Sequence, residues 1–91
     1  MPNPITVNCP DGEWTLIAED QVWGQIYRLD NKPAKYLYTY RLTGEDPPTL
    51  QTEGVPIFLT ADRYNLVAGV GVDVYIMAVG NTGKVRYDWW F

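Results

Sequence analysis

The sequence contains no histidine and no serine, and it has one cysteine among its 91 residues. Histidine is the side chain most used for acid–base catalysis near neutral pH, and it is the commonest metal ligand. A catalytic nucleophile also needs a base within hydrogen-bond reach, so the chain offers no familiar residue set for acyl transfer. These absences predict a protein that is not an enzyme and that uses no cofactor and no metal.

Acidic residues are the remaining source of catalytic groups. Neighbouring acids occur at Asp11/Glu13, Glu19/Asp20 and Glu45/Asp46, and a glycosidase needs only two carboxyl groups. However, acids in turns are usually just solvated, and the patterned calcium loop D-x-D-x-D-G is absent. We therefore interpret these acids as surface residues.

Positive charge is also scarce, because seven Lys and Arg residues are spread along a chain of net charge -4. Such a chain has no cluster of basic residues that could bind a phosphate backbone, so we expect no nucleic-acid partner. No apolar run approaches the roughly 20 residues of a membrane helix, and no signal peptide follows Met1. We expect no membrane contact, and synthesis and folding in the cytoplasm.

The single cysteine, Cys9, excludes an internal disulfide. We interpret it as a small apolar filler rather than a reactive thiol, since it has no resolving cysteine and no basic neighbours. A chain of this length buries only about 60 to 65 % of the surface that its unfolded form exposes. Such a chain is expected to be only modestly stable on its own. Contacts between subunits would add to its stability, which predicts a homo-oligomer.

Turn signals recur roughly every 8 to 12 residues, and no long segment has helical periodicity, which together predict an all-β fold. We expect a small antiparallel β-sandwich or barrel of about 6 to 8 strands over residues 11–91, preceded by an extended arm over residues 1–10. Three prolines in that arm leave only residues 5–7 as a short edge strand. The other predicted strands are 13–18, 22–29, 35–43, 55–59, 65–68, 71–79 and 84–91.

The connections between these strands are expected to take several forms. Residues 19–20 should separate two strands, and residues 44–54 should form the longest loop. Gly69 and Gly71 favour a bulge or a close approach before a central strand. The segment 80–83 is expected to close a hairpin between strands 71–79 and 84–91.

Aromatic residues make up 14 % of the chain, with four Trp and seven Tyr. Trp23, Tyr36, Tyr38 and Tyr40 could form a binding face on which a sugar stacks. The alternative, which we favour, is that Trp14 and Trp23 fill the core and the tyrosines cover a sheet face or a subunit contact.

The C-terminal residues Trp89, Trp90 and Phe91 give the clearest local indication of a partner. Successive strand residues point to opposite faces, so these aromatics cannot share one core unless the strand is covered on both sides. We therefore predict a partner interface formed by this end and the N-terminal arm. Its residues are Pro2, Pro4, Ile5, Val7, Trp89, Trp90 and Phe91.

The order of several short motifs resembles the small virion structural proteins of tailed bacteriophages. These motifs are Trp14-Thr15, Gly24-Gln25, Tyr27-Arg28, residues 38–44, Pro47-Pro48, residues 54–58, 73–76 and 83–86. The resemblance covers roughly residues 13–88 and is to capsid decoration or cement proteins and to head–tail proteins.

This resemblance implies a β-sandwich or barrel without enzyme activity, which assembles as an oligomer, often a trimer, on a capsid or tail surface in the virion. The expected partner is the major capsid protein or another virion subunit. A head–tail adaptor or tail component is the near alternative. A carbohydrate-binding module used in host attachment is an alternative of another class.

Overall fold

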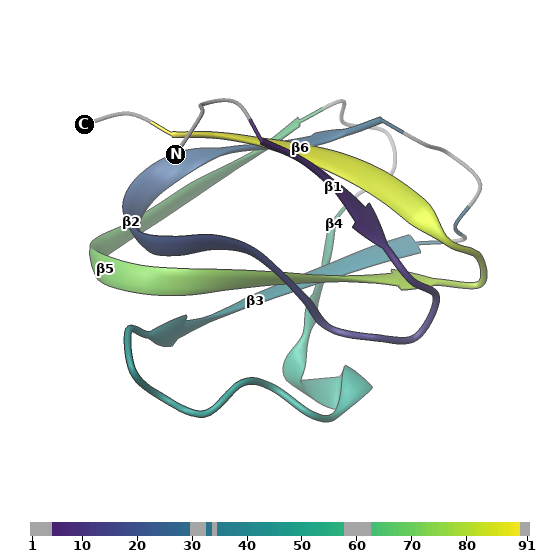
Figure 1. Cartoon of the computed structure of the whole chain (residues 1–91), viewed down its shortest axis with the longest axis horizontal. Helices are drawn as coiled ribbons and strands as arrows, with labels where there is room; N and C mark the ends of the chain where they lie inside the picture. The colour runs from purple at the N-terminus through teal and green to yellow at the C-terminus, as the bar shows by residue number, and fades with distance from the viewer. Residues whose placement is uncertain (1–4, 30–32, 34, 58–62, 90–91) are drawn as a thin grey trace.

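The computed structural model describes residues 5–29, 33, 35–57 and 63–89 (Figure 1). Within these residues it contains six strands and one short 3-10 helix, so the predicted all-β fold is confirmed. The elements are β1 (Ile5–Cys9), β2 (Thr15–Arg28), β3 (Lys35–Leu42), η1 (Gln51–Glu53), β4 (Val55–Ile57), β5 (Arg63–Val79) and β6 (Gly83–Trp89).

The six strands form one antiparallel hydrogen-bonded sheet in the order β1-β6-β2-β5-β3-β4. β2 and β5 contain 14 and 17 residues, and both bend so far that the sheet folds over itself (Figure 1). Residues 15–18 of β2 and 72–79 of β5 form a first layer with β3 and β4. Residues 23–28 and 63–67 form a second layer with β6 and β1. The predicted sandwich is therefore made from a single bent sheet.

The bend in β2 occurs at Glu19 and Asp20, where the sequence predicted a break between two strands. That prediction was wrong, because β2 continues through these residues while its register against β5 shifts. Asp20 has a left-handed φ of 53°, and its N–H donates to Asp73 Oδ1 at 3.1 Å. The Asp20 carboxylate occupies the space that a Cβ at Gly71 would need. The turn-forming residues thus produce a β-bulge, which bends a strand without ending it.

The predicted hairpin between residues 71–79 and 84–91 was also wrong. β6 pairs with β1 and with the second half of β2, whereas residues 72–79 pair with β3 and the first half of β2. The turn at 80–83 therefore carries the chain from the first layer to the second. Gly80 has φ 98°, and its N–H donates to Asp11 Oδ1 at 2.9 Å. Gly and Asn favour both kinds of turn, so the sequence signal does not separate a hairpin from a crossing.

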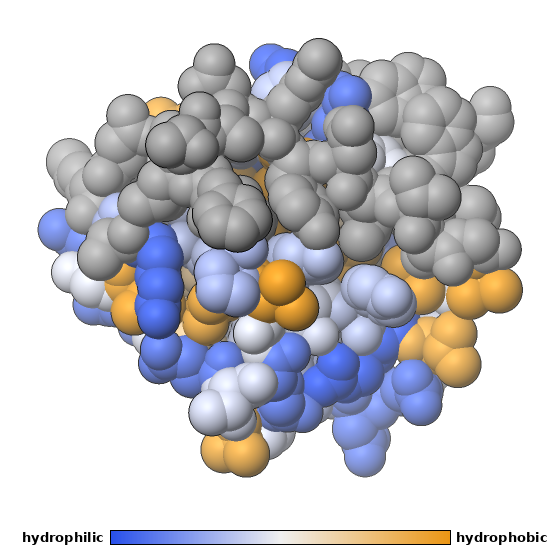
Figure 2. Space-filling model, turned by 180° about the vertical axis from the view of Figure 1, so that it is seen from behind, coloured by the Kyte–Doolittle hydropathy of each residue, from blue (hydrophilic) through white to orange (hydrophobic). Residues whose placement is uncertain are grey.

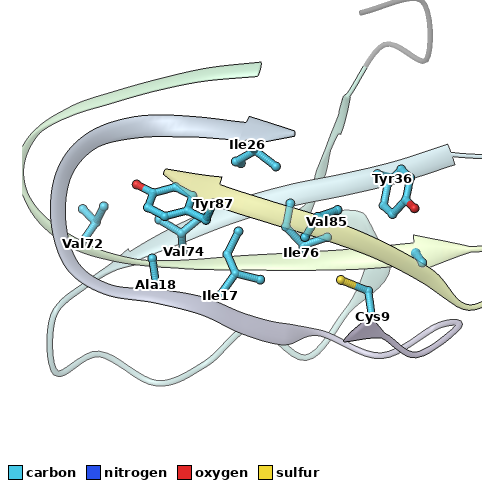
Figure 3. Close-up of a cluster of buried hydrophobic side chains, with 11 residues drawn as sticks. Cys9, Ile17, Ala18, Ile26, Tyr36, Val72, Val74, Ile76, Val85 and Tyr87 are labelled. Carbon is cyan, nitrogen blue, oxygen red and sulfur yellow. The ribbon is translucent and has the colours of Figure 1, made fainter. Parts of the chain in front are cut away.

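The core lies between the two layers (Figure 3). Along β5 the alternating residues Val72, Val74, Ile76 and Ala78 are completely buried, so this series faces the core. The remaining core side chains come from β1, β2, β3 and β6. The cluster comprises Cys9, Ile17, Ala18, Ile26, Tyr36, Val72, Val74, Ile76, Ala78, Val85 and Tyr87.

Several strand predictions agree with the structure. β3 has the predicted limits to within one residue, and β4 is a short edge strand that contains Pro56. The edge strand expected at residues 5–7 is present as β1 and extends to Cys9, so this part of the predicted arm belongs to the sheet. The strand expected at 65–68 is part of β5. Residues 1–4 of the arm lie outside the described residues, and so do residues 58–62, which include the end of the predicted strand 55–59.

The prediction that Trp14 fills the core would place Leu16 and Ala18, which share its face of the strand, inside as well, and this was only partly right. Ala18 is buried as expected, but Leu16 is 40 % exposed and its neighbour Ile17 is buried. The first register shift against β5 falls between Leu16 and Ala18. Because a shift of one residue exchanges the two faces of a strand, strict alternation fails at this point.

Truncation of the central strand tests the position of the core. Ile76→Ala should lower the free energy of unfolding by about 2 to 5 kcal/mol, because it removes buried methyl groups and leaves a cavity. Leu29→Ala is the control, since Leu29 is 47 % exposed, and it should change stability by less than about 0.5 kcal/mol. Urea unfolding followed by circular dichroism measures both. Equal losses for the two variants would contradict this core.

Candidate interaction surfaces

Three residues of the predicted partner interface lie on neighbouring strands, Ile5 and Val7 on β1 and Trp89 at the end of β6. β1 and β6 are antiparallel neighbours, with Ile5 opposite Tyr87 and Val7 opposite Val85 (Figure 1). Val7 is partly buried and packs against the core. The backbone of Trp89 pairs with Gly24, and the Trp89 side chain is not described. Pro2, Pro4, Trp90 and Phe91 lie outside the described residues.

The predicted aromatic binding face is not one continuous surface in the structure. Tyr36 is 1 % exposed and belongs to the core, and Tyr38 is partly buried against it. Tyr40 is 46 % exposed, while Trp23 pairs with Val67 through its backbone and its side chain is not described. Of the three tyrosines, only Tyr40 offers a substantial surface to a ligand.

Tyr36 has a structural role that the sequence did not indicate. Its hydroxyl accepts a hydrogen bond from the Lys84 N–H at 3.2 Å and lies 3.4 Å from the Lys84 carbonyl oxygen, to which it can donate. Tyr36 belongs to the first layer and Lys84 to the second. The phenol therefore ties the two layers together at the end of the sandwich where the chain crosses between them.

The outer face of the first layer is covered by the loop between β3 and β4, a feature absent from the sequence prediction. The Trp14 indole Nε1–H donates to the Leu50 carbonyl at 3.1 Å, and its ring lies against Gly54. Trp14 therefore packs outside the main core, although the sequence predicted that it fills the core. Four side chains on this outer face are consequently buried, namely Leu37, Thr39, Tyr75 and Met77.

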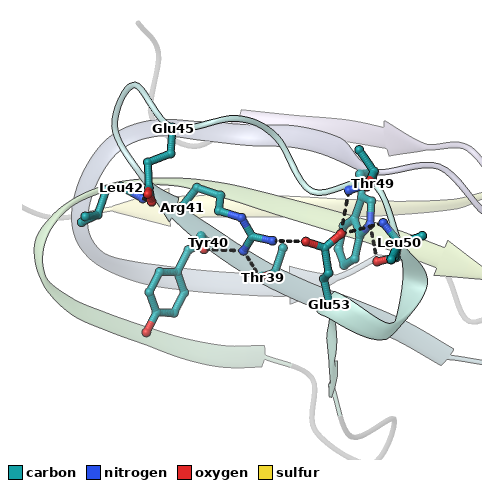
Figure 4. Close-up of polar contacts among 9 residues, drawn as sticks. Thr39, Tyr40, Arg41, Leu42, Glu45, Thr49, Leu50 and Glu53 are labelled. Atoms are coloured by element: carbon teal, nitrogen blue, oxygen red, sulfur yellow. Dashed lines mark hydrogen bonds and ion pairs between the residues drawn. The ribbon is translucent and has the colours of Figure 1, made fainter.

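An ion pair between Arg41 and Glu53 fastens this loop to the sheet (Figure 4). Arg41 Nη2 lies 2.6 Å from Glu53 Oε1, and Arg41 Nη1 donates to Thr39 Oγ1 at 3.0 Å. The other carboxylate oxygen, Glu53 Oε2, accepts the N–H groups of Thr49 and Leu50 at 2.8 and 2.6 Å. These backbone hydrogen bonds, together with Arg41, lower the pKa of Glu53 below its usual value.

The outer face of the second layer carries a polar row on β2 and β6. The Arg86 guanidinium lies 4.4 Å from the centroid of the Tyr27 ring and 3.4 Å from Asp88 Oδ2. The Tyr27 hydroxyl donates to Gln25 Oε1 at 2.6 Å. Cross-strand pairing places Tyr27 opposite Arg86 and Gln25 opposite Asp88, so these contacts stabilise the sheet.

Large apolar side chains are exposed at several separate places. Leu16 and Leu50 lie on the side covered by the loop, while Tyr40, Leu42 and Val70 lie at the end of the sandwich where β5 bends. Apolar atoms gather at this end along one margin of the back face (Figure 2). The exposed large apolar residues are Leu16, Leu29, Tyr40, Leu42, Leu50, Val55 and Val70.

The described residues form no metal site and no membrane-spanning helix. They contain no group of three or more Cys, Asp or Glu side chains that could hold a metal ion. Their only helix, η1, is too short to cross a membrane. No protein-family model, curated protein or solved structure matches the chain.

Cys9 is completely buried in the core, as predicted for a filler residue. Burial raises the pKa of its thiol to about 11. Because the thiolate is the reactive form, Cys9 should be protonated and protected in the folded protein. Iodoacetamide at mildly alkaline pH should label it only after urea unfolds the chain. Rapid labelling of the native protein would show that β1 leaves the sheet readily.

The attachment of the loop between β3 and β4 to the sheet should depend on pH through the ionisation of Glu53. The pKa of Glu53 is lower in the folded protein than in the unfolded chain, where it is about 4.3. The ionised carboxylate therefore stabilises the folded protein above pH about 4.3, and this stabilisation is lost as the pH falls through the lower pKa of the folded state. Glu53→Gln should release the loop at neutral pH, because it removes the charge that Arg41 pairs with.

Hydrogen exchange provides the measurement for this loop. In Glu53→Gln, the Thr49 and Leu50 amides should exchange faster and the Trp14 indole resonance should shift, while the amides of residues 72–78 stay protected. Glu13→Gln is the matched control, because Glu13 is an exposed acid outside the loop. Unchanged exchange at Thr49 and Leu50 in Glu53→Gln would mean that the carboxylate does not hold the loop.

Proposed function

We propose that this chain is a non-enzymatic structural protein of a tailed-phage virion, acting as a decoration or cement protein on the assembled capsid. Its partner would be the major capsid protein or another virion subunit. A protein that binds the assembled lattice and not the free subunits stabilises the shell by mass action. The motif order described above supports the phage assignment.

The dispersal of exposed apolar side chains is the structural observation that supports this role. Leu16 and Leu50 lie on one side, while Leu42 and Val70 lie at the end where β5 bends. A protein with a single partner needs one apolar patch, whereas a subunit held within a lattice contacts neighbours on more than one side. Apolar exposure in several places fits the second arrangement.

The edges of the sheet support oligomerisation in the same role. β1 is an edge strand of the sheet, so the backbone groups along one of its two sides pair with none of the described strands. Such an edge can pair with a strand of another chain. We propose that β1 and the neighbouring end of β6 contact adjacent subunits, with a trimer as the favoured assembly.

The number of copies in purified particles tests this function. Quantitative mass spectrometry of the phage that encodes the chain should find it in hundreds of copies per particle if it decorates the capsid. A dozen copies or fewer would instead identify a neck or tail component. Particles that lack the chain, or capsids equally resistant to heat with and without it, would contradict the cementing role.

A further inference from the structure

We propose that the free edge of β1 is a pairing site for a second copy of this chain, which adds its own β1 antiparallel to the first across a twofold axis. The inference rests on the contact at β1 in the proposed function and deepens it, because it names the partner strand and the register. A twofold contact joins copies in pairs, so within the proposed lattice it would link neighbouring trimers.

The backbone hydrogen bonds of β6 determine which groups of β1 face its free edge. β6 lies between β1 and β2 in the sheet (Figure 1). The Lys84 carbonyl accepts the N–H of Leu29, the residue after β2, at 3.0 Å, so the backbone groups of Lys84 point toward β2. Successive residues of an antiparallel strand direct these groups to opposite sides. The N–H and C=O groups of the next residue, Val85, therefore point toward β1.

This alternation assigns the backbone groups of β1. Val7 is opposite Val85, so the two residues exchange their hydrogen bonds. Thr6 and Asn8 lie on either side of Val7, and they direct their N–H and C=O groups away from β6. Both side chains are exposed. The free edge therefore presents a donor and an acceptor at Thr6 and again at Asn8, and these groups pair with none of the described strands.

The two edges of the sheet differ in how well they are protected against such pairing. At the other edge, β4 has three residues and includes Pro56, which has no N–H to donate. β1 has five residues with no proline, and no bulge interrupts its register against β6. It also has no charged residue, and charged side chains are a common means of blocking an edge. β1 is therefore the edge that is suited to accept a strand.

A second copy matches this edge in length and in hydrogen-bonding pattern. Antiparallel pairing centred on Val7 places Thr6 of one copy opposite Asn8 of the other, so each such pair can exchange both of its hydrogen bonds. In the sequence, Pro4 and Pro10 stand three residues before and after Val7. Pro10 cannot donate an N–H to a longer partner strand. A second copy carries prolines at the matching positions and needs no such donor.

The size of the contact sets its expected affinity. A strand of five residues on each side buries less than the about 800 Å² per partner of a standard interface, so association in solution should be weak and reversible. Neighbouring subunits on a lattice meet at a high effective concentration, which compensates for a weak contact.

Amide hydrogen exchange at increasing concentrations of the full chain tests the pairing. The Thr6 and Asn8 amides should exchange freely in a dilute sample and become protected as the concentration rises to about 1 mM. The Val7 amide should stay protected throughout, because it donates to β6 within one copy. In a mixture of differently isotope-labelled copies, a nuclear Overhauser contact between the Val7 α protons of two copies should define the register.

A pair of new charges on β1 tests the register without weakening the fold. Thr6→Asp combined with Asn8→Asp places like charges opposite each other when two copies pair, so association should weaken about tenfold. Within one copy the new acids lie opposite Arg86 and Lys84 of β6, which favours folding.

The matched control adds the same charge outside β1. Gln51→Glu combined with Thr52→Glu changes two exposed residues of η1, and this variant should associate like the original chain. Equal weakening by both double variants would mean that net charge opposes association, and it would contradict pairing in this register.

Three further outcomes would overturn the proposal. The first is exchange at Thr6 and Asn8 that stays unchanged up to about 1 mM, which would leave the edge to a strand of another protein. The second is protection of both amides in a dilute monomer, which would show that a segment of the same chain covers the edge. The third is association that the aspartate variant does not weaken.

The pairing and the proposed function fail separately. Absence of the chain from phage particles would remove the proposed function and leave the pairing of two copies in solution intact. A chain that stays monomeric at every concentration would remove the pairing, and the number of copies in purified particles would still decide the function.

Discussion

The bend shared by β2 and β5 is the constraint on which the rest of this structure depends. A flat sheet of six strands in this order would leave both faces open to water, and a chain of 91 residues has too few residues to cover them with helices. Folding the sheet over itself lets one set of strands cover another. The bulge at Asp20 and the missing side chain at Gly71 permit that fold, because the Asp20 carboxylate occupies the place of a Cβ.

Two further features follow from this bend. The layers meet face to face around the valines of β5, and the Tyr36 hydroxyl joins them at the end opposite the bend. At the bend itself the second layer no longer covers β3, so Tyr40 and Leu42 remain exposed on the core face. The same distortion that buries most of the apolar surface therefore leaves a small part of it exposed to solvent.

The sequence predicted the fold class and most strands because alternation is a local property. The series Val72, Val74, Ile76 and Ala78 has a period of two residues, which predicted a strand at 71–79, and these residues do lie in β5. Strand pairing was harder to predict from the sequence, because Gly80 and its neighbours suit both a hairpin and a crossing between layers. The bulge at Glu19 and Asp20 was mistaken for a break for a similar reason, because its residues are those of a turn.

The candidate surfaces were harder to predict, because exposure depends on which segments lie above a face. Tyr36, Tyr38 and Tyr40 share one side of β3, yet the second layer buries the first and leaves the last exposed. On the opposite side, Leu37 and Thr39 are covered by a loop whose attachment depends on Arg41 and Glu53, which are 12 residues apart. The spacing of these two residues in the sequence therefore does not predict the ion pair unless the path of the loop is known.

The two-layer fold requires that residues 72–79 of β5 and strand β6 lie in different layers although a short turn joins them. Nuclear Overhauser contacts between backbone protons measure this directly. The two-layer fold predicts contacts between Ile26 and Tyr87 and between Tyr38 and Ile76. A regular ladder of contacts between residues 72–79 and 84–89 would instead demonstrate a hairpin, and it would contradict both the two-layer fold and the exposure of Tyr40 and Leu42 at its bend.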